Sequence, residues 1–182
     1  MGSGDPRESA SRWRAGVWFL LALGCANPAF VTDGSGFRHR LPGFQVASPT
    51  LLEPSWRRVE VDGEALSFRG PRGAIMSLQT SCRPRRASPR LLAQHLQIGL
   101  PERAQRDSRA VRAGTLDAWS RIFDVRGPQG VVRVRTVTAV YRDCVLDWVL
   151  SGDASFEDAQ PLFDSWWGSF EPEPEPDGGE SP

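Results

Sequence analysis

Short stretches in which apolar and polar residues alternate follow one another along most of the chain, and each stretch predicts a β-strand. The predicted strands cover residues 37–40, 44–47, 56–61, 64–69, 74–82, 109–113, 116–125, 131–141 and 144–151. Turn residues separate them, and Asp62-Gly63 is the strongest short hairpin signal. Because a parallel crossover needs a dozen residues or more, connections this short predict antiparallel neighbours.

Two segments have the period of a helix instead. Ser88 and Pro89 are suited to the N-cap and first position of a helix, and Leu92, Leu96 and Leu100 follow on one face, with Leu91 and Ile98 beside them. A second helix is predicted from about Asp158, with Pro161 tolerable only in its first turn. Its apolar face is formed by Leu162, Phe163, Trp166, Trp167 and Phe170. The pattern therefore predicts one α+β domain over residues 37–170, with an antiparallel sheet of six to eight strands and two packed helices.

This order of elements resembles the Mog1/PsbP-like α/β/α sandwich, which occurs in a photosystem accessory protein, a nuclear-transport factor and many bacterial lipoproteins. The residues that carry the resemblance are Phe44-Gln-Val-Ala-Ser-Pro49, Trp56, Leu66-Ser-Phe68, Gly73-Ala-Ile75, Ser88-Pro-Arg-Leu-Leu92, Gly114, Phe163 and Phe170. All are packing or turn residues. The resemblance therefore implies a fold over residues 37–170 and transfers no catalytic or binding residue.

The first 24 residues have the composition of an export signal. Three arginines lie within residues 1–14, and ten mainly apolar residues then lead to Cys25. Ten residues rise only about 15 Å as a helix, which is half of a bilayer core, so we expect no transmembrane anchor here.

The segment Leu21-Ala-Leu-Gly-Cys25 resembles a bacterial lipobox, in which the cysteine becomes the lipidated first residue of the mature protein. The resemblance implies a signal peptide over residues 1–24 and a membrane anchor at Cys25. Ala26 follows where an Asp would favour the inner membrane, so the outer membrane is expected by analogy. The alternative is a plain secretory signal cleaved after Ala26.

Polar segments flank the predicted domain. Residues 25–36 form a flexible spacer in this interpretation, and residues 171–182 an acidic, proline-rich, disordered tail. The whole chain has 22 basic residues, all of them Arg, and 22 acidic residues. Residues 25–170 hold 19 Arg against 15 acids, while the tail adds five acids. A net charge of zero argues against a nucleic-acid partner.

An exported protein meets an oxidising compartment, which bears on the two remaining cysteines. Cys82 and Cys144 permit one pairing, and a disulfide between them is expected. The alternative is two buried free thiols.

Few side chains are suited to catalysis or to metal binding. His39 lies between two arginines, and His95 is expected on the first helix, at the edge of the core or on the surface. Neither histidine has a partner at ligand spacing. No nucleophile elbow, Walker loop or dinucleotide fingerprint is present. We therefore expect neither an enzyme nor a cofactor.

Arginine is the remaining candidate for ligand binding. Arg83, Arg85, Arg86 and Arg90 cluster before the first helix and could bind carboxylate, phosphate or lipid headgroups. In a chain without Lys, such a cluster also arises by chance from a GC-rich coding sequence. Arg133 and Arg135 share one strand face and are expected to point to solvent. Trp119, Trp148, Trp166 and Trp167 are expected in the core, with a half-exposed Trp pair at the helix end as the alternative.

Together these features predict a non-catalytic lipoprotein of the cell envelope that binds a protein partner or helps to assemble a complex. The alternative is an exported domain that binds a small anionic or lipid ligand through Arg83, Arg85, Arg86 and Arg90.

Overall fold

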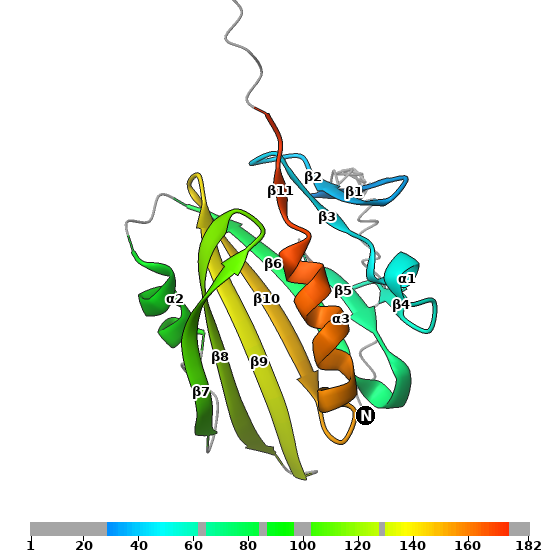
Figure 1. Cartoon of the computed structure of the whole chain (residues 1–182), viewed down its shortest axis with the longest axis vertical. Helices are drawn as coiled ribbons and strands as arrows, with labels where there is room; N and C mark the ends of the chain where they lie inside the picture. The colour runs from blue at the N-terminus through cyan, green and yellow to red at the C-terminus, as the bar shows by residue number, and fades with distance from the viewer. Residues whose placement is uncertain (1–28, 62–64, 84–86, 97–102, 128–129, 175–182) are drawn as a thin grey trace, which may run out of the picture.

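The computed structural model describes residues 29–61, 65–83, 87–96, 103–127 and 130–174, which form two antiparallel sheets with three helices (Figure 1). The larger sheet has the strand order β4-β5-β6-β10-β9-β8-β7. Its strands are β4 (Arg57–Val59), β5 (Leu66–Arg69), β6 (Ile75–Cys82), β7 (Arg103–Ala113), β8 (Leu116–Gly127), β9 (Gly130–Tyr141) and β10 (Cys144–Gly152). The smaller sheet has the order β1-β2-β3-β11, with β1 (Phe30–Asp33), β2 (Gly36–His39), β3 (Phe44–Ala47) and β11 (Glu171–Pro172).

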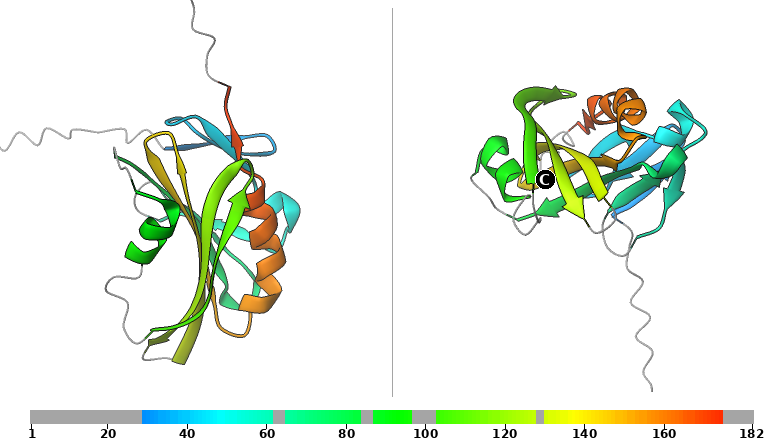
Figure 2. Two further views of the ribbon diagram at one scale, coloured as in Figure 1. Left: turned by 60° about the vertical axis from the view of Figure 1, so that its left-hand side comes forward. Right: turned by 90° about the horizontal axis from the view of Figure 1, so that it is seen from below.

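Two helices cover opposite faces of the seven-stranded sheet, which gives the predicted α/β/α arrangement (Figure 2). Helix α2 (Pro89–His95) packs on β8 and β9, while α3 (Phe156–Gly168) packs mainly on β10. A single turn of helix, α1 (Pro49–Leu52), and the 3-10 turn η1 (Pro71–Gly73) connect strands near the start of α3. The predicted fold class is confirmed.

Aromatic rings join the two sheets and α3 into one core. Phe44 of β3 lies 5.3 Å from Phe170 at the end of α3, measured between ring centroids. Phe68 of β5 meets Trp166 of α3 edge to face at 5.5 Å, and Trp148 of β10 meets Phe170 at 6.2 Å. These five side chains are at most 1% exposed. The smaller sheet is therefore part of the same hydrophobic core.

The order of strands in the sheet differs from their order in the chain. After β6 the chain forms α2 and then runs to β7 at the far edge of the sheet, from which β8, β9 and β10 return strand by strand. Strand β10 thereby fills the position beside β6, where Trp148 lies opposite both Leu78 and Val137. Gly114, in the turn between β7 and β8, has φ +56°, and a Cβ there would lie 2.1 Å from the carbonyl oxygen of Phe170. A side chain at this position would prevent the close approach of the turn to the end of α3.

The folded part of the chain extends beyond the predicted limits of 37 and 170 at both ends. Strand β1 and the turn to β2 occupy most of the predicted spacer, because Phe30 is buried against His39 and Phe44 and the polar residues after it form a tight turn. At the other end, Glu171 and Pro172 pair with β3, so the predicted tail begins as a strand. Residues 1–28 and 175–182, which include the predicted signal peptide and most of the predicted tail, lie outside the described residues.

The helix signals give one confirmation and one correction. Ser88 is the N-cap of α2, and its Oγ accepts a hydrogen bond from the backbone N–H of Leu91 at 3.4 Å. Helix α3 begins at Phe156, two residues before the predicted start, so Pro161 lies in its second turn and not in its first. Pro161 has no backbone N–H to donate to the preceding turn. The helix tolerates this missing hydrogen bond because Phe156, Phe163 and Trp166 anchor it in the core.

Candidate functional site: an arginine-lined groove

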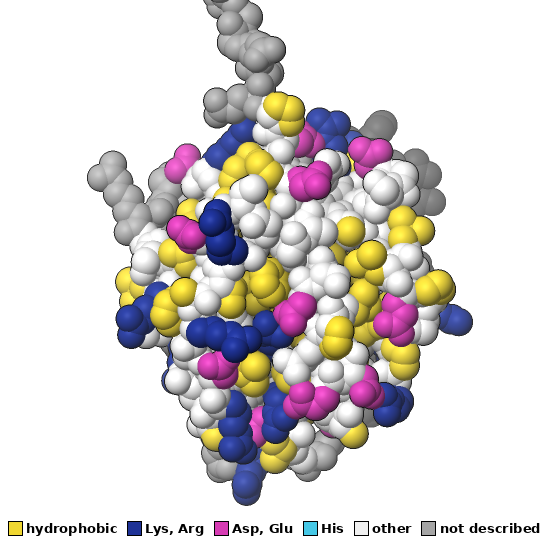
Figure 3. Space-filling view, viewed as in Figure 1, with side chains coloured by type: hydrophobic (Ala, Val, Ile, Leu, Met, Phe, Trp, Pro, Cys, Tyr) yellow, Lys and Arg dark blue, Asp and Glu magenta, His cyan; other side chains and the backbone are white. Residues whose placement is uncertain are grey.

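Positively charged side chains gather where the outer strands of the large sheet meet the first turns of α3. We call this region the arginine groove. It consists of Arg103, Arg106, Ile122, Asp124, Arg126, Val131, Arg133, Phe156, Glu157 and Gln160. Two hollows of about 350 and 410 Å³ make up the groove, and Arg106 lines both of them. Figure 3 shows basic side chains, interleaved with acidic ones, over this part of the molecule.

Strand register explains why the lining side chains of β8 and β9 share one face. Asp124 of β8 lies directly opposite Arg133 of β9, so both point to the side of the sheet that α3 covers. In β7 the pairing with β8 is irregular between Gln105 and Asp107, which leaves Arg106 as an extra residue in the strand. Such a bulge re-aims a side chain. Here the Arg106 guanidinium reaches Asp124.

Asp124 holds two guanidinium groups in place. Its Oδ2 accepts from Nε of Arg106 at 2.8 Å, and its Oδ1 accepts from Nε of Arg133 at 2.9 Å. Nη1 of Arg133 also donates to Oε1 of Glu157 on α3 at 2.6 Å. The hydrogen bonds from Arg133 and Arg106 lower the pKa of Asp124, so this carboxylate is ionised at neutral pH. The carboxylate is mostly buried, so its charge serves to orient the two arginines.

Two residues further along β9, on the same face, Arg135 is buried between the sheet and α3. Its side chain is 4% exposed, and Nη2 lies 2.8 Å from Oδ1 of Asp164. Ser120 and Gln160 accept further hydrogen bonds from Arg135 at 3.3 Å, and its guanidinium lies 5.7 Å from the centre of the Phe163 ring. Arg135 is therefore a buried cation bound to the inner face of α3.

This result corrects the prediction that Arg133 and Arg135 point to solvent. Strand alternation places both arginines on the face that Val137 and Ala139 continue, and those two residues are buried in the structure. The second helix carries Glu157, Gln160 and Asp164 at spacings of three and four residues, which place them on one helix face as possible partners for these arginines. The sequence does not show which face of the strand a helix covers, so it does not distinguish a buried arginine from a solvent-exposed one.

The predicted arginine cluster before the first helix is only partly described. Arg83 is exposed just beyond β6, while Arg90 lies on α2 with its guanidinium 5.2 Å from the centre of the Trp119 ring. Arg85 and Arg86 lie outside the described residues. A ligand site formed by these four residues therefore stays a prediction.

The two cysteines of the domain lie at disulfide distance. Cys82 and Cys144 are directly opposite each other on β6 and β10, and their Sγ atoms are 2.09 Å apart. The register of these two strands brings together residues that are 62 positions apart in the sequence. Cys25 lies outside the described residues.

The histidines and tryptophans are packing residues for the most part. His39 is buried, stacked on Phe44 at 5.1 Å, and His95 is exposed on α2. Trp148 and Trp166 are fully buried as predicted, whereas Trp119 and Trp167 are partly exposed. Among the described residues no group of three or more His, Cys, Asp or Glu is placed to hold a metal ion. In the same part of the chain no helix is long and apolar enough to cross a membrane.

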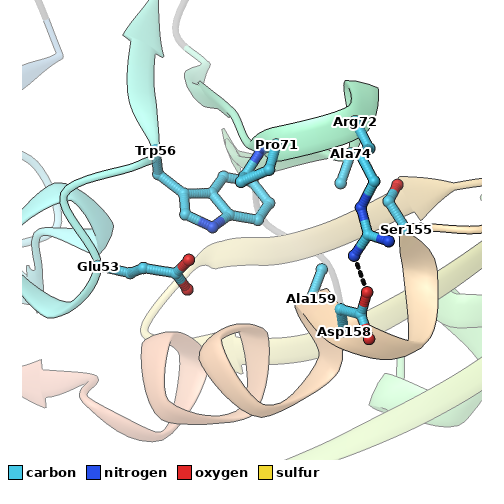
Figure 4. Close-up of a pocket in the computed structure, with 8 residues that line it drawn as sticks. All are labelled: Glu53, Trp56, Pro71, Arg72, Ala74, Ser155, Asp158 and Ala159. Carbon is cyan, nitrogen blue, oxygen red and sulfur yellow. Dashed lines mark hydrogen bonds and ion pairs between the residues drawn. The ribbon is translucent and has the colours of Figure 1, made fainter.

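A second, smaller hollow lies between α1, η1 and the start of α3 (Figure 4). It measures about 90 Å³ and is lined by Glu53, Trp56, Pro71, Arg72, Ala74, Ser155, Asp158 and Ala159. Arg72 forms an ion pair with Asp158 at its edge. A water molecule occupies about 30 Å³ of liquid, so this hollow has room for a few waters and not for an organic ligand. The arginine groove is the larger and more charged of the two sites.

The strand order and the two helices on opposite faces of the sheet define a PsbP-like fold. PsbP of the cyanobacterium Synechocystis superposes on this chain with a TM-score of 0.52 at 16% sequence identity, covering 85% of this chain and 99% of that chain. LpqN of Mycobacterium tuberculosis, described as involved in cell envelope biogenesis, gives a TM-score of 0.53 at 17% identity, with 80% and 90% covered.

A crystal structure from Bacteroides thetaiotaomicron gives a TM-score of 0.52 at 10% identity. It covers 72% of this chain, which spans 46% of that longer protein. No family model matches the sequence, and no curated protein matches it. At these identities the similarity concerns the fold alone.

Proposed function

We propose that this protein is a non-catalytic lipoprotein of the bacterial cell envelope that binds a protein partner or helps to assemble a complex. The observation that carries the proposal is a PsbP-like domain preceded by a lipobox-like segment, with Cys25 four residues before the first described residue, Ala29. The similar fold of LpqN, a protein involved in cell envelope biogenesis, supports an envelope location.

The short connection between anchor and domain gives the proposal a geometric consequence. Four residues span at most about 14 Å when fully extended. A lipid on Cys25 would therefore hold β1 and the smaller sheet close to the membrane surface. A domain held in this way can bind a partner that is in, or attached to, the same membrane. Ala26 after the cysteine favours the outer membrane over the inner one.

Metabolic labelling tests the anchor. Cells that express the wild-type chain are expected to incorporate radiolabelled palmitate into it, and cells that express Cys25→Ala are not. Cys82→Ala is the matched control, because it removes another cysteine and is expected to keep the label. Equal labelling of wild type and Cys25→Ala, or no label in either, would contradict the proposal. A mature N-terminus after Ala26 would indicate secretion without an anchor.

Cross-linking in intact cells tests the partner. A tagged wild-type chain is expected to form one dominant, reproducible cross-linked species with an envelope protein, identified by mass spectrometry. The same species is expected to weaken in Cys25→Ala, because the unanchored domain is diluted away from the membrane. Recovery of no reproducible species from the wild type would oppose a binding or assembly function.

A further inference from the structure

Leu41, in the turn between β2 and β3, is the most exposed large apolar residue in the described part of the chain. Its exposed fraction is 77%, whereas Phe37 and Phe44 on the two flanking strands are at most 5% exposed. The Leu41 side chain therefore adds little to the hydrophobic core. Single exposed apolar residues are common on protein surfaces, so the location of Leu41 decides whether it has a role.

Leu41 lies where the chain enters the domain. The backbone N–H of Arg40 donates to the carbonyl oxygen of Ala29, the first described residue, at 3.1 Å. Cys25 precedes Ala29 by four residues, which span at most about 14 Å when fully extended. A lipid on Cys25 would therefore hold the turn that contains Leu41 next to the bilayer.

The ends of β6, β9 and β10 meet this turn at one end of the molecule (Figure 1). Sγ of Cys82, the last residue of β6, lies 4.0 Å from the carbonyl oxygen of Leu41. The side chain of Arg142, between β9 and β10, donates to the carbonyl oxygen of Pro42. These contacts fix the turn against the large sheet, so the position of Leu41 follows that of the whole domain. We call this region the anchor-side surface, and it consists of Arg40, Leu41, Pro42 and Arg83, the residue after Cys82.

Two of the four residues of the anchor-side surface are cations. Arg40 and Arg83 are both exposed, and neither forms an ion pair with another described residue. Two acids lie at the same end of the domain: Glu173 forms an ion pair with Arg38, and Asp143 is exposed in the turn between β9 and β10. Guanidinium groups beside an exposed leucine suit a bilayer interface, where phosphates lie above the acyl chains.

We propose that the anchor-side surface docks on the bilayer that holds the anchor, with Leu41 in the interface and Arg40 and Arg83 at the level of the headgroup phosphates. This inference rests on the proposed anchor at Cys25. One leucine is too weak to hold a free protein on a membrane. The anchor, however, keeps the surface at a high effective concentration near the bilayer, so the contact only has to select one orientation of the domain.

A fluorescent probe at two positions tests the orientation. The full chain is isolated from membranes and reconstituted into phosphatidylglycerol vesicles that contain nitroxide-labelled lipids. An environment-sensitive dye is attached to Leu41→Cys or, as the matched control, to Ile75→Cys, and the chain without an added cysteine gives the background of the labelling. Ile75 is 46% exposed at the other end of β6, about 23 Å along the strand from Cys82. The dye at position 41 is expected to show blue-shifted emission and several-fold stronger quenching by the nitroxide than the dye at position 75.

Removing charges tests the contact with the headgroups. Arg40→Gln/Arg83→Gln, with the dye at position 41, is expected to reduce the quenching toward the value at position 75. Arg57→Gln/Arg69→Gln removes the same charge from two exposed arginines that lie opposite each other near the Ile75 end of the sheet. This control is expected to leave the quenching at position 41 unchanged. All four arginines are exposed, so both double variants are expected to fold.

The outcomes separate this inference from the anchor itself. Incorporation of palmitate together with equal quenching at positions 41 and 75 would support the anchor and overturn the docked surface. Stronger quenching at position 41 that Arg40→Gln/Arg83→Gln leaves unchanged would overturn the role of the two arginines. A chain without palmitate would overturn the anchor and, with it, this inference.

Discussion

Arg135 and Asp164 form an ion pair in which only the arginine is buried, so substitutions of the two residues are expected to differ in their effect on stability. Arg135 is almost entirely buried, whereas the side chain of Asp164 is 47% exposed. Removing the charge of Asp164 by Asp164→Asn leaves a buried cation without its counter-ion. Removing the cation by Arg135→Met leaves a carboxylate that water can still reach. We therefore expect Asp164→Asn to be the more destabilising substitution.

The magnitude follows from the geometry. Two unit charges about 4 Å apart attract by about 4 kcal/mol at an effective dielectric constant of about 20. Because about half of Asp164 faces water, we take half of this value, about 2 kcal/mol, as the expected loss in the free energy of unfolding. The asparagine can still accept hydrogen bonds from Arg135 and from Trp167, whose Nε1 lies 3.0 Å from Oδ1 of Asp164. Arg135→Met loses the attraction, but it also removes the cost of burying a charged guanidinium and keeps the packing on Phe163. We therefore expect the free energy of unfolding to fall by about 1 kcal/mol or less.

Urea unfolding at pH 7, followed by tryptophan fluorescence, measures these differences. Asp158→Asn on the same helix is the control. Its ion pair with Arg72 is 63% exposed on both sides, so a loss below about 1 kcal/mol is expected. The double variant Arg135→Met/Asp164→Asn is expected to be close to Arg135→Met alone. If Arg135→Met costs at least 1 kcal/mol more than Asp164→Asn, the reasoning is refuted, because the buried guanidinium is then the main source of stability.

Three further predictions concern other parts of the domain. Replacing Cys82 and Cys144 together by alanine is expected to lower the free energy of unfolding by about 4 kcal/mol, since the bridge closes a loop of 62 residues; unchanged urea unfolding under non-reducing conditions would contradict the bridge. The lowered pKa of Asp124 contributes stability above its ordinary pKa, and this contribution is lost as the pH falls through the folded-state value. Asp124→Asn should therefore be less stable at pH 7 and lose less stability on acidification below about pH 4, and parallel pH profiles for the two proteins would refute this. In Gly70→Ala the new Cβ would lie 2.4 Å from the buried Trp56 indole, so thermal unfolding should show a loss of about 2 kcal/mol, and an unchanged melting temperature would disprove the clash.

Several elements were predicted from the sequence because their signals are local. The Ser88-Pro89 pair marks the start of α2, since a cap and a first-turn proline act within one helical turn. The alternation in residues 74–82 predicted β6, because side-chain period is a property of the strand itself. Residues 30–36 show the limit of this approach. Their polar and small residues are typical of both a spacer and a tight turn, and only the burial of Phe30 distinguishes the two.

The candidate site depends on contacts between segments that are distant in the chain. Arg106, Asp124, Arg133 and Glu157 come from three strands and a helix, and none of them stands out among the 22 arginines and 22 acids of the chain. The bulge at Arg106 is a misfit between two strands, so neither strand alone shows it. The sequence drew attention to arginines 83–90 because they are adjacent in the chain, whereas the groove forms from arginines that are adjacent in the fold.

The sequence by itself determined the class of the fold, the number of helices that cover the large sheet, and the pair of cysteines available for a bridge. Those features follow from local periodicity, turn chemistry and composition, which act over a few residues. The tertiary structure decided that β10 lies between β6 and β9, that Arg135 is buried, and that an arginine groove exists. These depend on which faces pack together, and that choice is made by the burial of the whole aromatic core, not by any one segment.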